Sequence, residues 1–269
     1  MTTKQLQLQV ADGVLAYDDN EQAGELIVLV PGMGDLRSEY RFIVPVLNEA
    51  GYRVVTVDLR GHGESSANWP EYSIRAVGQD ILALIEHLDA GPVTVVGTSF
   101  SPGSVVWAAV EKPELISKLV LICPFVRDPK TNPAMKLLVN VMMSGPWKVW
   151  AWGMFYKSLY STQTPPDFAD YQAKLKANLS EPGRYEAVKG LGQASKADAE
   201  ARLTQVTQPS LVIMGDKDPD FSPPEAEAKF VAEKLGGRYE MIAGAGHYPQ
   251  AEMPDKVIPI LLKFLREGK

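Results

Sequence analysis

The chain has 269 residues, of which 45% are hydrophobic and 22% are charged, a composition typical of a globular protein with a sizeable core. Its net charge is −6 and its basic residues form no cluster, so the sequence disfavours nucleic acid as a partner. A single cysteine, Cys123, excludes an intramolecular disulfide and favours a reducing compartment.

Two segments bear on localisation. Residues 1–13 alternate polar and apolar side chains and lack the continuous apolar stretch of a secretory signal. The most apolar later segment, residues 149–156, is too short to span a bilayer. We therefore expect a cytoplasmic protein with no membrane span.

Short runs of β-branched residues alternate with longer helical patterns along most of the chain, which indicates a mostly parallel sheet covered by helices. Eight strands are expected, at residues 5–10, 14–19, 25–30, 52–58, 92–97, 117–123, 209–215 and 238–244. Helices are expected at residues 39–50, 73–89, 103–111, 224–235 and 254–266. The first two strands are predicted to form a hairpin, because only Ala11 to Gly13 separate them and Gly13 suits a turn.

The alternation stops between residues 124 and 206, where β-branched runs are missing and Trp, Met, Tyr and Pro are frequent. We interpret this segment as a helical cap inserted after the sixth strand, so that residues 1–123 and 207–269 form the core and residues 124–206 the cap. Its aromatic side chains are candidates for a substrate pocket, with ordinary packing inside the cap as the alternative. They are Trp147, Trp150, Trp152, Phe155 and Tyr156.

The segment GTSFSPG, residues 97–103, follows a predicted strand and opens a predicted helix. It is nearly the G-x-S-x-G signature, in which a nucleophilic serine lies on a sharp strand-to-helix turn. Pro102 suits the first turn of a helix, and Gly97 permits a close backbone approach before the turn. We predict that Ser99 is a nucleophile; the alternative is that its hydroxyl only caps the helix.

A serine nucleophile needs a histidine base, and the chain has three histidines. His247 follows the last predicted strand in a glycine-containing loop, from which it could reach a serine at the strand ends. His87 lies at a helix end, where packing or capping is the more common role. His62 lies in a glycine-rich turn and could approach a site. We favour His247 as the base.

The acid that orients the histidine should leave another strand end between Ser99 and His247. Asp218, followed by Pro219 after the strand at 209–215, is the preferred candidate, and Asp216 is the runner-up. Asp128 is a more remote option. Clustered aspartates after a strand also occur simply as turn formers.

The oxyanion of an acyl-transfer reaction needs two backbone N–H donors. The strand at residues 25–30 ends in Pro31-Gly32-Met33-Gly34, whose glycines allow the backbone to turn its amides inward. We expect the N–H groups of Met33 and Phe100 to be the donors.

Together these segments resemble the α/β-hydrolase superfamily. The resemblance rests on VLVPGMGD, VDLRGHGESS, VVGTSFSPG, LVIMGDKD and GAGHYPQAEMPD, in the order nucleophile, acid, histidine. It implies that Ser99, Asp218 and His247 form a triad and that Met33 and Phe100 donate to the oxyanion. It also implies that the turn holding Asp58 and His62 is structural.

Two departures from the family pattern concern the predicted site. Pro31-Gly32 stands where the family often has His-Gly, which leaves the backbone donor two residues later in place. Ser101 stands where the second glycine of the signature is usual, which we interpret as a tolerated packing variant. Relatives of bacterial stress regulators and plant butenolide receptors look similar at this position.

The expected function is hydrolysis of small or medium carboxylic esters through an acyl-enzyme, with a small-molecule substrate and no cofactor or metal. Serine at position 99 argues against haloalkane dehalogenases and epoxide hydrolases, which attack through a carboxylate. A C–C bond hydrolase, perhydrolase, thioesterase or lactonase with the same triad remains an alternative, because fold and triad do not define the substrate. A ligand sensor with slow turnover is a further alternative.

Overall fold

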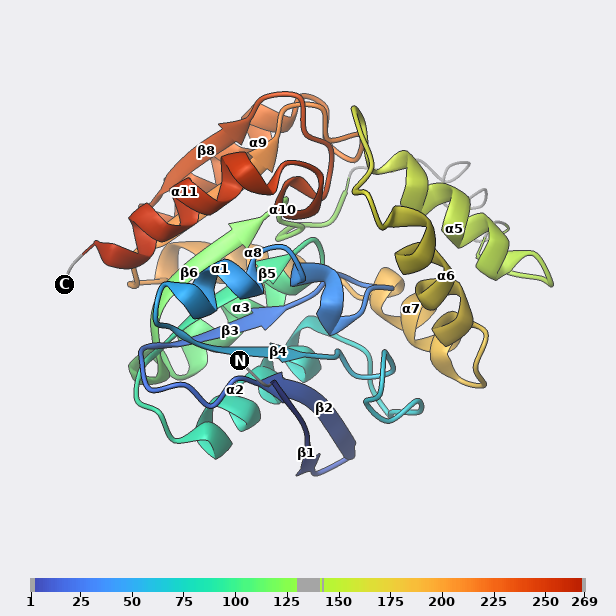
Figure 1. Ribbon diagram of the computed structural model, residues 1–269, viewed down its shortest axis with the longest axis horizontal. Helices are drawn as coiled ribbons and strands as arrows, with labels where there is room; N and C mark the ends of the chain where they lie inside the picture. Colours follow the sequence, from blue (N-terminus) through green and yellow to red (C-terminus); the bar gives the residue numbers. More distant parts are fainter. Residues whose placement is uncertain (1–2, 130–140, 142, 268–269) are drawn as a thin grey trace.

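The computed structural model describes residues 3–129, 141 and 143–267. Its eight strands form one sheet in the order β1-β2-β4-β3-β5-β6-β7-β8 (Figure 1). The strands are β1 (Lys4–Val10), β2 (Gly13–Asp19), β3 (Leu26–Val30), β4 (Arg53–Val57), β5 (Val93–Thr98), β6 (Ile116–Ile122), β7 (Ser210–Gly215) and β8 (Arg238–Ile242).

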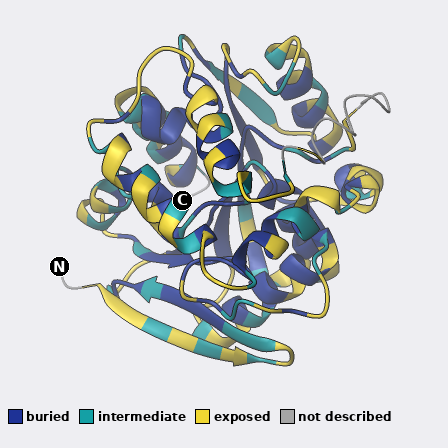
Figure 2. Cartoon of the chain, turned by 90° about the vertical axis from the view of Figure 1, so that its right-hand side faces the viewer, coloured by how far each residue is buried: buried dark blue, intermediate teal, exposed yellow. Residues whose placement is uncertain are grey.

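The first two strands form an antiparallel hairpin, and β2 also pairs antiparallel with β4. All other neighbours are parallel. Strands β3, β5 and β7 are buried along their whole length, which explains why they read as continuous apolar runs. The edge strand β1 is largely exposed (Figure 2).

Helices cover the sheet and also form a separate group between β6 and β7 in the chain. Those of the core are α1 (Val44–Glu49), α2 (Ile74–Leu88), α3 (Ser101–Glu111), α9 (Pro224–Leu235), α10 (Pro249–Glu252) and α11 (Pro254–Arg266). Among the described residues, the helices between β6 and β7 are α5 (Lys148–Ser158), α6 (Phe168–Leu179), α7 (Arg184–Gln193) and α8 (Ala197–Arg202). Short 3-10 turns are η1 (Arg37–Tyr40), η2 (Pro113–Leu115) and η3 (Leu203–Gln205). Figure 1 shows α5, α6 and α7 grouped at the right, away from α9 and α11.

The predicted α/β-hydrolase fold is confirmed, and all eight predicted strands are present within a few residues of their expected ends. The helix expected at residues 39–50 is instead split into η1 and α1, with Pro45 in the first turn of α1. The hairpin turn is formed by Ala11 and Asp12, and Gly13 already belongs to β2. Gly13 is needed for close packing, because a Cβ there would lie 2.9 Å from the Trp69 ring.

The segment between β6 and β7 packs in two ways. Near its ends, Val126, Ala199 and Leu203 join the main hydrophobic core of the sheet. Its middle forms two smaller clusters, around Tyr156 and around Trp152. This difference supports a cap in the middle of the segment, while its limits at residues 124 and 206 stay a prediction.

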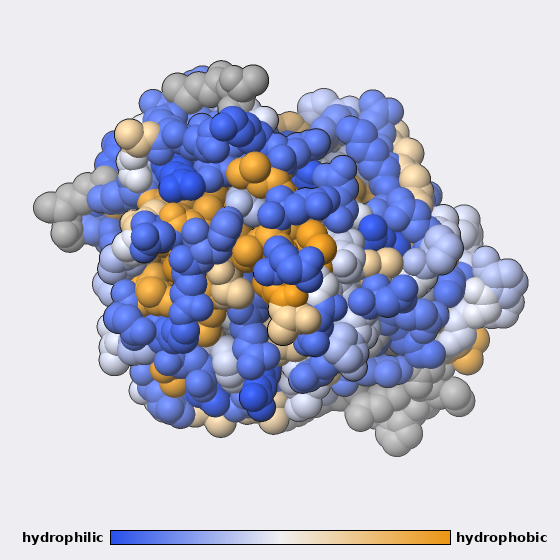
Figure 3. All heavy atoms as spheres, turned by 90° about the horizontal axis from the view of Figure 1, so that it is seen from below, coloured by the Kyte–Doolittle hydropathy of each residue, from blue (hydrophilic) through white to orange (hydrophobic). Residues whose placement is uncertain are grey.

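The face of the molecule that is seen from below is mostly polar (Figure 3). From below, hydrophilic residues cover most of the face, and hydrophobic residues form separated patches (Figure 3). Within the described ranges, no helix has both the length and the apolar character needed to cross a bilayer.

Candidate active site

Ser99 lies on a strained turn between β5 and α3. Its φ of 61° is in the left-handed region that residues other than glycine rarely adopt. The turn is held on both sides, because the Ser99 N–H donates to Ile122 O (2.9 Å) and the Ser99 carbonyl accepts from Phe125 N (2.9 Å). The N-cap residue of α3 is Phe100, with no side-chain cap bond. The helix-cap alternative for Ser99 therefore has no support in the contacts.

Asp218 and His247 form a buried pair after β7 and β8. The His247 Nδ1 lies 2.7 Å from Asp218 Oδ2. The backbone of His247 is fixed by its N–H, which donates to Leu159 O (2.8 Å), and Asp218 Oδ1 accepts from Asp220 N (3.0 Å). Because Nδ1 faces Asp218, the imidazole presents Nε2 to any further partner.

The electrostatics of this pair favour a protonatable histidine. Burial alone would lower the pKa of His247, but Asp218 raises it, with smaller contributions from Asp220 and Glu39, and the net pKa lies above the ordinary value. An imidazole of this kind can accept a proton near neutral pH and keep the resulting charge beside a carboxylate.

The other two candidate aspartates have different partners. Asp216 accepts from the Gly244 N–H (2.6 Å) at the exposed end of β8. Asp128 accepts from the Ser195 hydroxyl (2.6 Å) and from Lys196 N (2.8 Å). Of the three, Asp218 is the one bonded to His247.

Phe125 connects the serine turn to the histidine. Its N–H holds the Ser99 carbonyl, and its ring centre lies 5.8 Å from that of His247. Within the described part of the chain, the Ser99 hydroxyl is not hydrogen-bonded to His247. Catalytic contacts of this type are often long in ligand-free structures and tighten when substrate binds.

The loop after β3 passes directly beside Ser99. A Cβ on Gly32 would lie 3.1 Å from Ser99 Cβ, so glycine is needed for this approach. Among the described residues, the backbone N–H groups of Met33 and Phe100 donate to no protein acceptor. Both predicted donors are therefore available to a ligand.

Ser101 has a specific contact that the sequence analysis missed. Its buried hydroxyl donates to the Pro31 carbonyl in the loop after β3. The serine that replaces the usual glycine therefore ties the Ser99 turn to the loop that carries Met33, which is more than a tolerated packing change.

His62 holds the same loop from another side. Its Nε2 accepts from the Gly34 N–H (2.9 Å), and its Nδ1 lies 3.0 Å from Arg60 O. Burial lowers the pKa of His62 to about 4, so the ring stays neutral and can keep accepting this bond. His87 lies in the last turn of α2, with its ring edge-on to Tyr17 at 6.3 Å.

Glu39 in η1, which no sequence pattern singled out, connects the loop after β3 to α10. Its carboxylate accepts from the Gly32 N–H (2.8 Å) and from Gln250 Nε2 (2.6 Å). The same Gln250 nitrogen lies 3.3 Å from the hydroxyl of Thr98, the residue before Ser99. Burial, together with the nearby Asp35, raises the pKa of Glu39 to about 8.

A second buried carboxyl, Asp35, connects the loop after β3 to the cap. It accepts from the Tyr156 hydroxyl of α5 (3.0 Å) and from the Tyr171 hydroxyl of α6. Trp152 also packs on this loop, since a Cβ on Gly34 would overlap its ring. The cap therefore contacts the loop that carries Met33 through both polar and aromatic groups.

The five aromatic residues predicted for a pocket separate into two groups. Trp152 and Tyr156 are buried against the loop after β3, and the ring of Phe155 lies 5.4 Å from that of Trp152. Trp147 and Trp150 are 49% and 64% exposed, and the structure does not bring them to the other predicted site residues.

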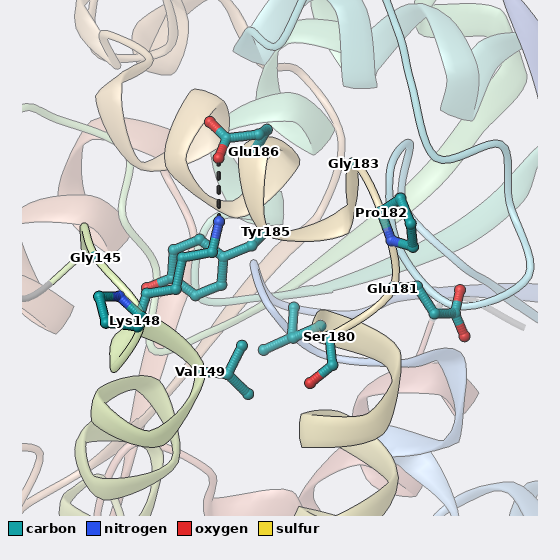
Figure 4. A pocket seen from close by; sticks show the side chains of 11 residues that line it. Gly145, Lys148, Val149, Ser180, Glu181, Pro182, Gly183, Tyr185 and Glu186 are labelled. Carbon is teal, nitrogen blue, oxygen red and sulfur yellow. Dashed lines mark hydrogen bonds and ion pairs between the residues drawn. The ribbon is translucent and has the colours of Figure 1, made fainter.

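A cavity of about 370 Å³ lies on the cap, between the start of α5 and the start of α7 (Figure 4). The Lys148–Glu186 ion pair (3.3 Å) crosses it. None of the predicted site residues lines this cavity.

One group of metal-ligating residue types occurs in the described chain. Ligand atoms of Cys123, Asp218 and His247 lie within 4.8 Å of one another. Burial raises the pKa of the Cys123 thiol well above its usual value, and Asp218 already bonds His247. These contacts fit an acid–histidine pair better than a metal centre, which would need a thiolate.

Comparisons with known proteins identify the family and the fold. The family profile described as "alpha/beta hydrolase fold" matches residues 25–254. A probable esterase from Oryza sativa subsp. japonica is 27% identical over 256 residues, which cover 90% of this chain and 91% of that protein. The karrikin insensitive 2 receptor IA from Petunia hybrida is 26% identical, with 89% of each chain covered.

A solved structure shows the same fold over the whole chain. The crystal structure of a bromoperoxidase from Bacillus anthracis superposes with a TM-score of 0.85 at 24% identity, covering 99% of this chain and 100% of that one. With a family match that spans most of its length and the same sheet and helices, this chain belongs to the α/β hydrolase family.

Proposed function

We propose that the protein is a serine hydrolase that cleaves small or medium carboxylic esters through an acyl-enzyme formed on Ser99. The observation that carries the proposal is the left-handed backbone of Ser99 on a strand-to-helix turn, which Phe125 links to the buried Asp218–His247 pair. Strain of this kind persists where the surrounding structure requires it, and a nucleophile presented at a sheet edge is such a case.

The chemistry follows from the positions of these groups. His247 Nε2 would take the proton of the Ser99 hydroxyl as its oxygen attacks the ester carbonyl, and Asp218 would stabilise the imidazolium. The carbonyl oxygen, now negative, would accept from the N–H groups of Met33 and Phe100. Collapse would return the proton to the departing alcohol, and water would then release the acid by the same route.

The substrate class rests on the cap. Trp152, Phe155 and Tyr156 would border the acyl or alcohol side of the site, since Trp152 and Tyr156 pack on the loop that carries Met33. An apolar border made of these aromatic side chains suits a small or medium ester with no bound cofactor. We place the reaction in the cytoplasm, as the sequence suggests.

A panel of p-nitrophenyl esters with acyl chains from two to twelve carbons tests the proposal. We expect multiple turnovers on at least one ester and a loss of at least about 10⁴-fold in kcat for Ser99→Ala. A matched control is Ser104→Ala, because the buried Ser104 hydroxyl has no partner among the described residues. Turnover that survives Ser99→Ala would contradict the proposal.

A ligand sensor with slow turnover is the second candidate. Two observations favour it: the Petunia relative is named a receptor, and Asp35 bonds two tyrosines of the cap, so cap position and site geometry are coupled. The same panel separates the candidates. One acylation per molecule without release of the acid would favour the sensor, and sustained turnover would favour the enzyme.

A further inference from the structure

Tyr248 directly follows His247, and its ring is rigidly held. The residue is 2% exposed. Its ring stacks on Tyr160 at 5.5 Å, lies 5.2 Å from Tyr156 and meets His247 edge-on at 5.3 Å. Aromatic packing on three sides leaves the ring little freedom, so the position of the hydroxyl is well defined.

The Tyr248 hydroxyl and Ser99 both lie against Gly32. A Cβ built on Gly32 would be 3.5 Å from Tyr248 Oη and 3.1 Å from Ser99 Cβ. The hydroxyl and the serine therefore border the same space, which Gly32 leaves open by having no side chain. Gly32 immediately precedes Met33, the predicted oxyanion donor, so this space adjoins the expected position of the substrate carbonyl.

The hydroxyl also has no protein partner among the described residues, unlike its neighbours. The hydroxyls of Tyr156 and Tyr171 both bond Asp35, and that of Tyr40 bonds Val30 O and Thr98. The Tyr248 oxygen is not among the fully buried side-chain atoms that lack a partner, so it borders space that a water or a ligand can reach. It is therefore a donor left free for a ligand, in a neighbourhood where the other buried tyrosines are paired.

The surroundings keep this hydroxyl a donor. Burial, with the charges of Asp35 and Glu39, raises the pKa of Tyr248 well above its usual value. The phenol therefore stays protonated across the range in which a histidine base works.

We propose that Tyr248 is a further catalytic residue, whose hydroxyl donates a hydrogen bond to the substrate carbonyl oxygen as negative charge develops on it. It acts as a third donor beside Met33 and Phe100. The proposal rests on the proposed function, because it needs an acyl substrate on Ser99. No covalent bond to Tyr248 is involved, and the phenol keeps its proton throughout.

Tyr248→Phe removes this hydroxyl and leaves the ring packing intact. The matched control is Tyr160→Phe, because Tyr160 lies in the same aromatic stack but its hydroxyl contacts Tyr156 (3.2 Å). For each variant we would measure kcat and KM on the best p-nitrophenyl ester, and Ki for an alkylboronic acid. The boronic acid forms a tetrahedral adduct with a reactive serine and so reports oxyanion stabilisation.

For Tyr248→Phe we expect kcat to fall about 10- to 100-fold with KM within about 2-fold of wild type, and Ki to rise by a similar factor as kcat falls. Tyr160→Phe should stay within about 3-fold in all three constants. Thermal melting should show Tyr248→Phe at least as stable as wild type, because the lost hydroxyl had no protein partner. An unchanged kcat and Ki, or a change in KM alone, would overturn the assignment.

Labelling with a fluorophosphonate separates this inference from the proposed function. If wild-type Ser99 is neither labelled nor needed for turnover, both proposals fail. If wild type is labelled and turns over ester, and Tyr248→Phe matches it in kcat and Ki, only the role of Tyr248 fails.

Discussion

The loops at the carboxyl ends of the strands and the cap helix α5 are organised in different ways. The loops are held by buried polar contacts, such as Glu39 with Gly32, Ser101 with Pro31, and Asp218 with His247. Helix α5 has one face packed on the loop after β3 and one face in solvent. Trp152 and Tyr156, four residues apart, lie on the inner face, and Trp150 and Met154 lie on the exposed one.

This difference indicates that the loops position the reacting groups and that the inner face of α5 shapes the substrate-binding space. Hydrogen bonds fix distances closely and so suit groups that must meet a transition state. Aromatic packing excludes water and shapes a border, with less demand on exact position. Substitutions in the loops should therefore change kcat and its pH dependence. Substitutions on the inner face of α5 should change substrate binding and stability. Substitutions on its outer face should change neither activity nor stability to a large extent.

After Ser99 itself, the largest effect is expected at Asp218. Asp218→Asn removes the charge that stabilises the imidazolium and favours the wrong tautomer of His247, so kcat should fall by about 10³- to 10⁴-fold. The control is Asp216→Asn, because Asp216 is exposed and bonds the Gly244 N–H. Steady-state kinetics on one ester measures the kcat of both variants. An equal loss in Asp216→Asn would contradict the assignment of Asp218 as the acid that orients His247.

The pH profile should show the raised pKa of His247. The imidazole must be neutral to act as a base, so kcat/KM should fall about tenfold per pH unit below its pKa, with a midpoint above 6.5. Asp218, Asp220 and Glu39 are the carboxyls that raise this pKa. Replacing Asp218 by Asn should therefore move the midpoint to lower pH. If the midpoint of the fall in kcat/KM at low pH is the same in Asp218→Asn and wild type, the titrating group is not His247.

On the inner face of α5, Trp152→Ala should damage both stability and binding. Removing a buried indole from the cluster with Leu179, Tyr185 and Val188 should cost about 3 to 5 kcal/mol in the free energy of unfolding. KM should rise more than kcat falls, because the loop contact that borders the substrate is lost. Urea denaturation measures the stability and steady-state kinetics measures KM and kcat. A loss of kcat at constant KM would contradict a role of Trp152 in substrate binding and would assign it to positioning the reacting groups, as for the loops.

Ser101 gives a smaller effect within the loops. Ser101→Ala removes the bond to the Pro31 carbonyl, which should cost about 1 kcal/mol of stability and lower kcat about 3- to 10-fold at nearly constant KM. The matched control is Ser104→Ala, about one turn further along α3, because the buried Ser104 hydroxyl has no hydrogen-bond partner among the described residues. Equal kcat and KM for the two variants would show that the bond from Ser101 to Pro31 does not contribute to catalysis and that Ser101 only packs.

The smallest effect is expected on the outer face of α5. Trp150 is 64% exposed, so Trp150→Ala should change the unfolding free energy by less than about 0.5 kcal/mol and leave kcat and KM within about 2-fold. Paired with Trp152→Ala, it compares the same substitution on opposite faces of one helix. A large rise in KM for Trp150→Ala would show that substrate reaches the outer face.

Local patterns were sufficient for the fold and for the positions of the loops. Continuous apolar runs marked β3, β5 and β7, and the segment around Ser99 carried its own turn signals in Gly97 and Pro102. Because the carboxyl ends of parallel strands meet at one edge, Ser99, Asp218 and His247 could be assigned to one site before any distance was known. Their catalytic roles remain predictions.

Contacts between distant segments were not predictable in the same way. The bonds from Tyr156 and Tyr171 to Asp35 join residues 121 and 136 positions apart. Glu39 and Gln250 are 211 positions apart, and no spacing rule connects them. The faces of α5 were also missed, because its five aromatics were treated as one set; a period of 3.6 residues would have separated Trp152 and Tyr156 from Trp150.

The central claim is that Ser99 is the residue that becomes acylated. The most direct measurement is to treat the protein with a fluorophosphonate, follow ester turnover, and map the modified residue by peptide mass spectrometry. The account predicts one modification, on Ser99, that appears in step with the loss of activity. Modification of Ser101 or Ser104 with Ser99 untouched would contradict it.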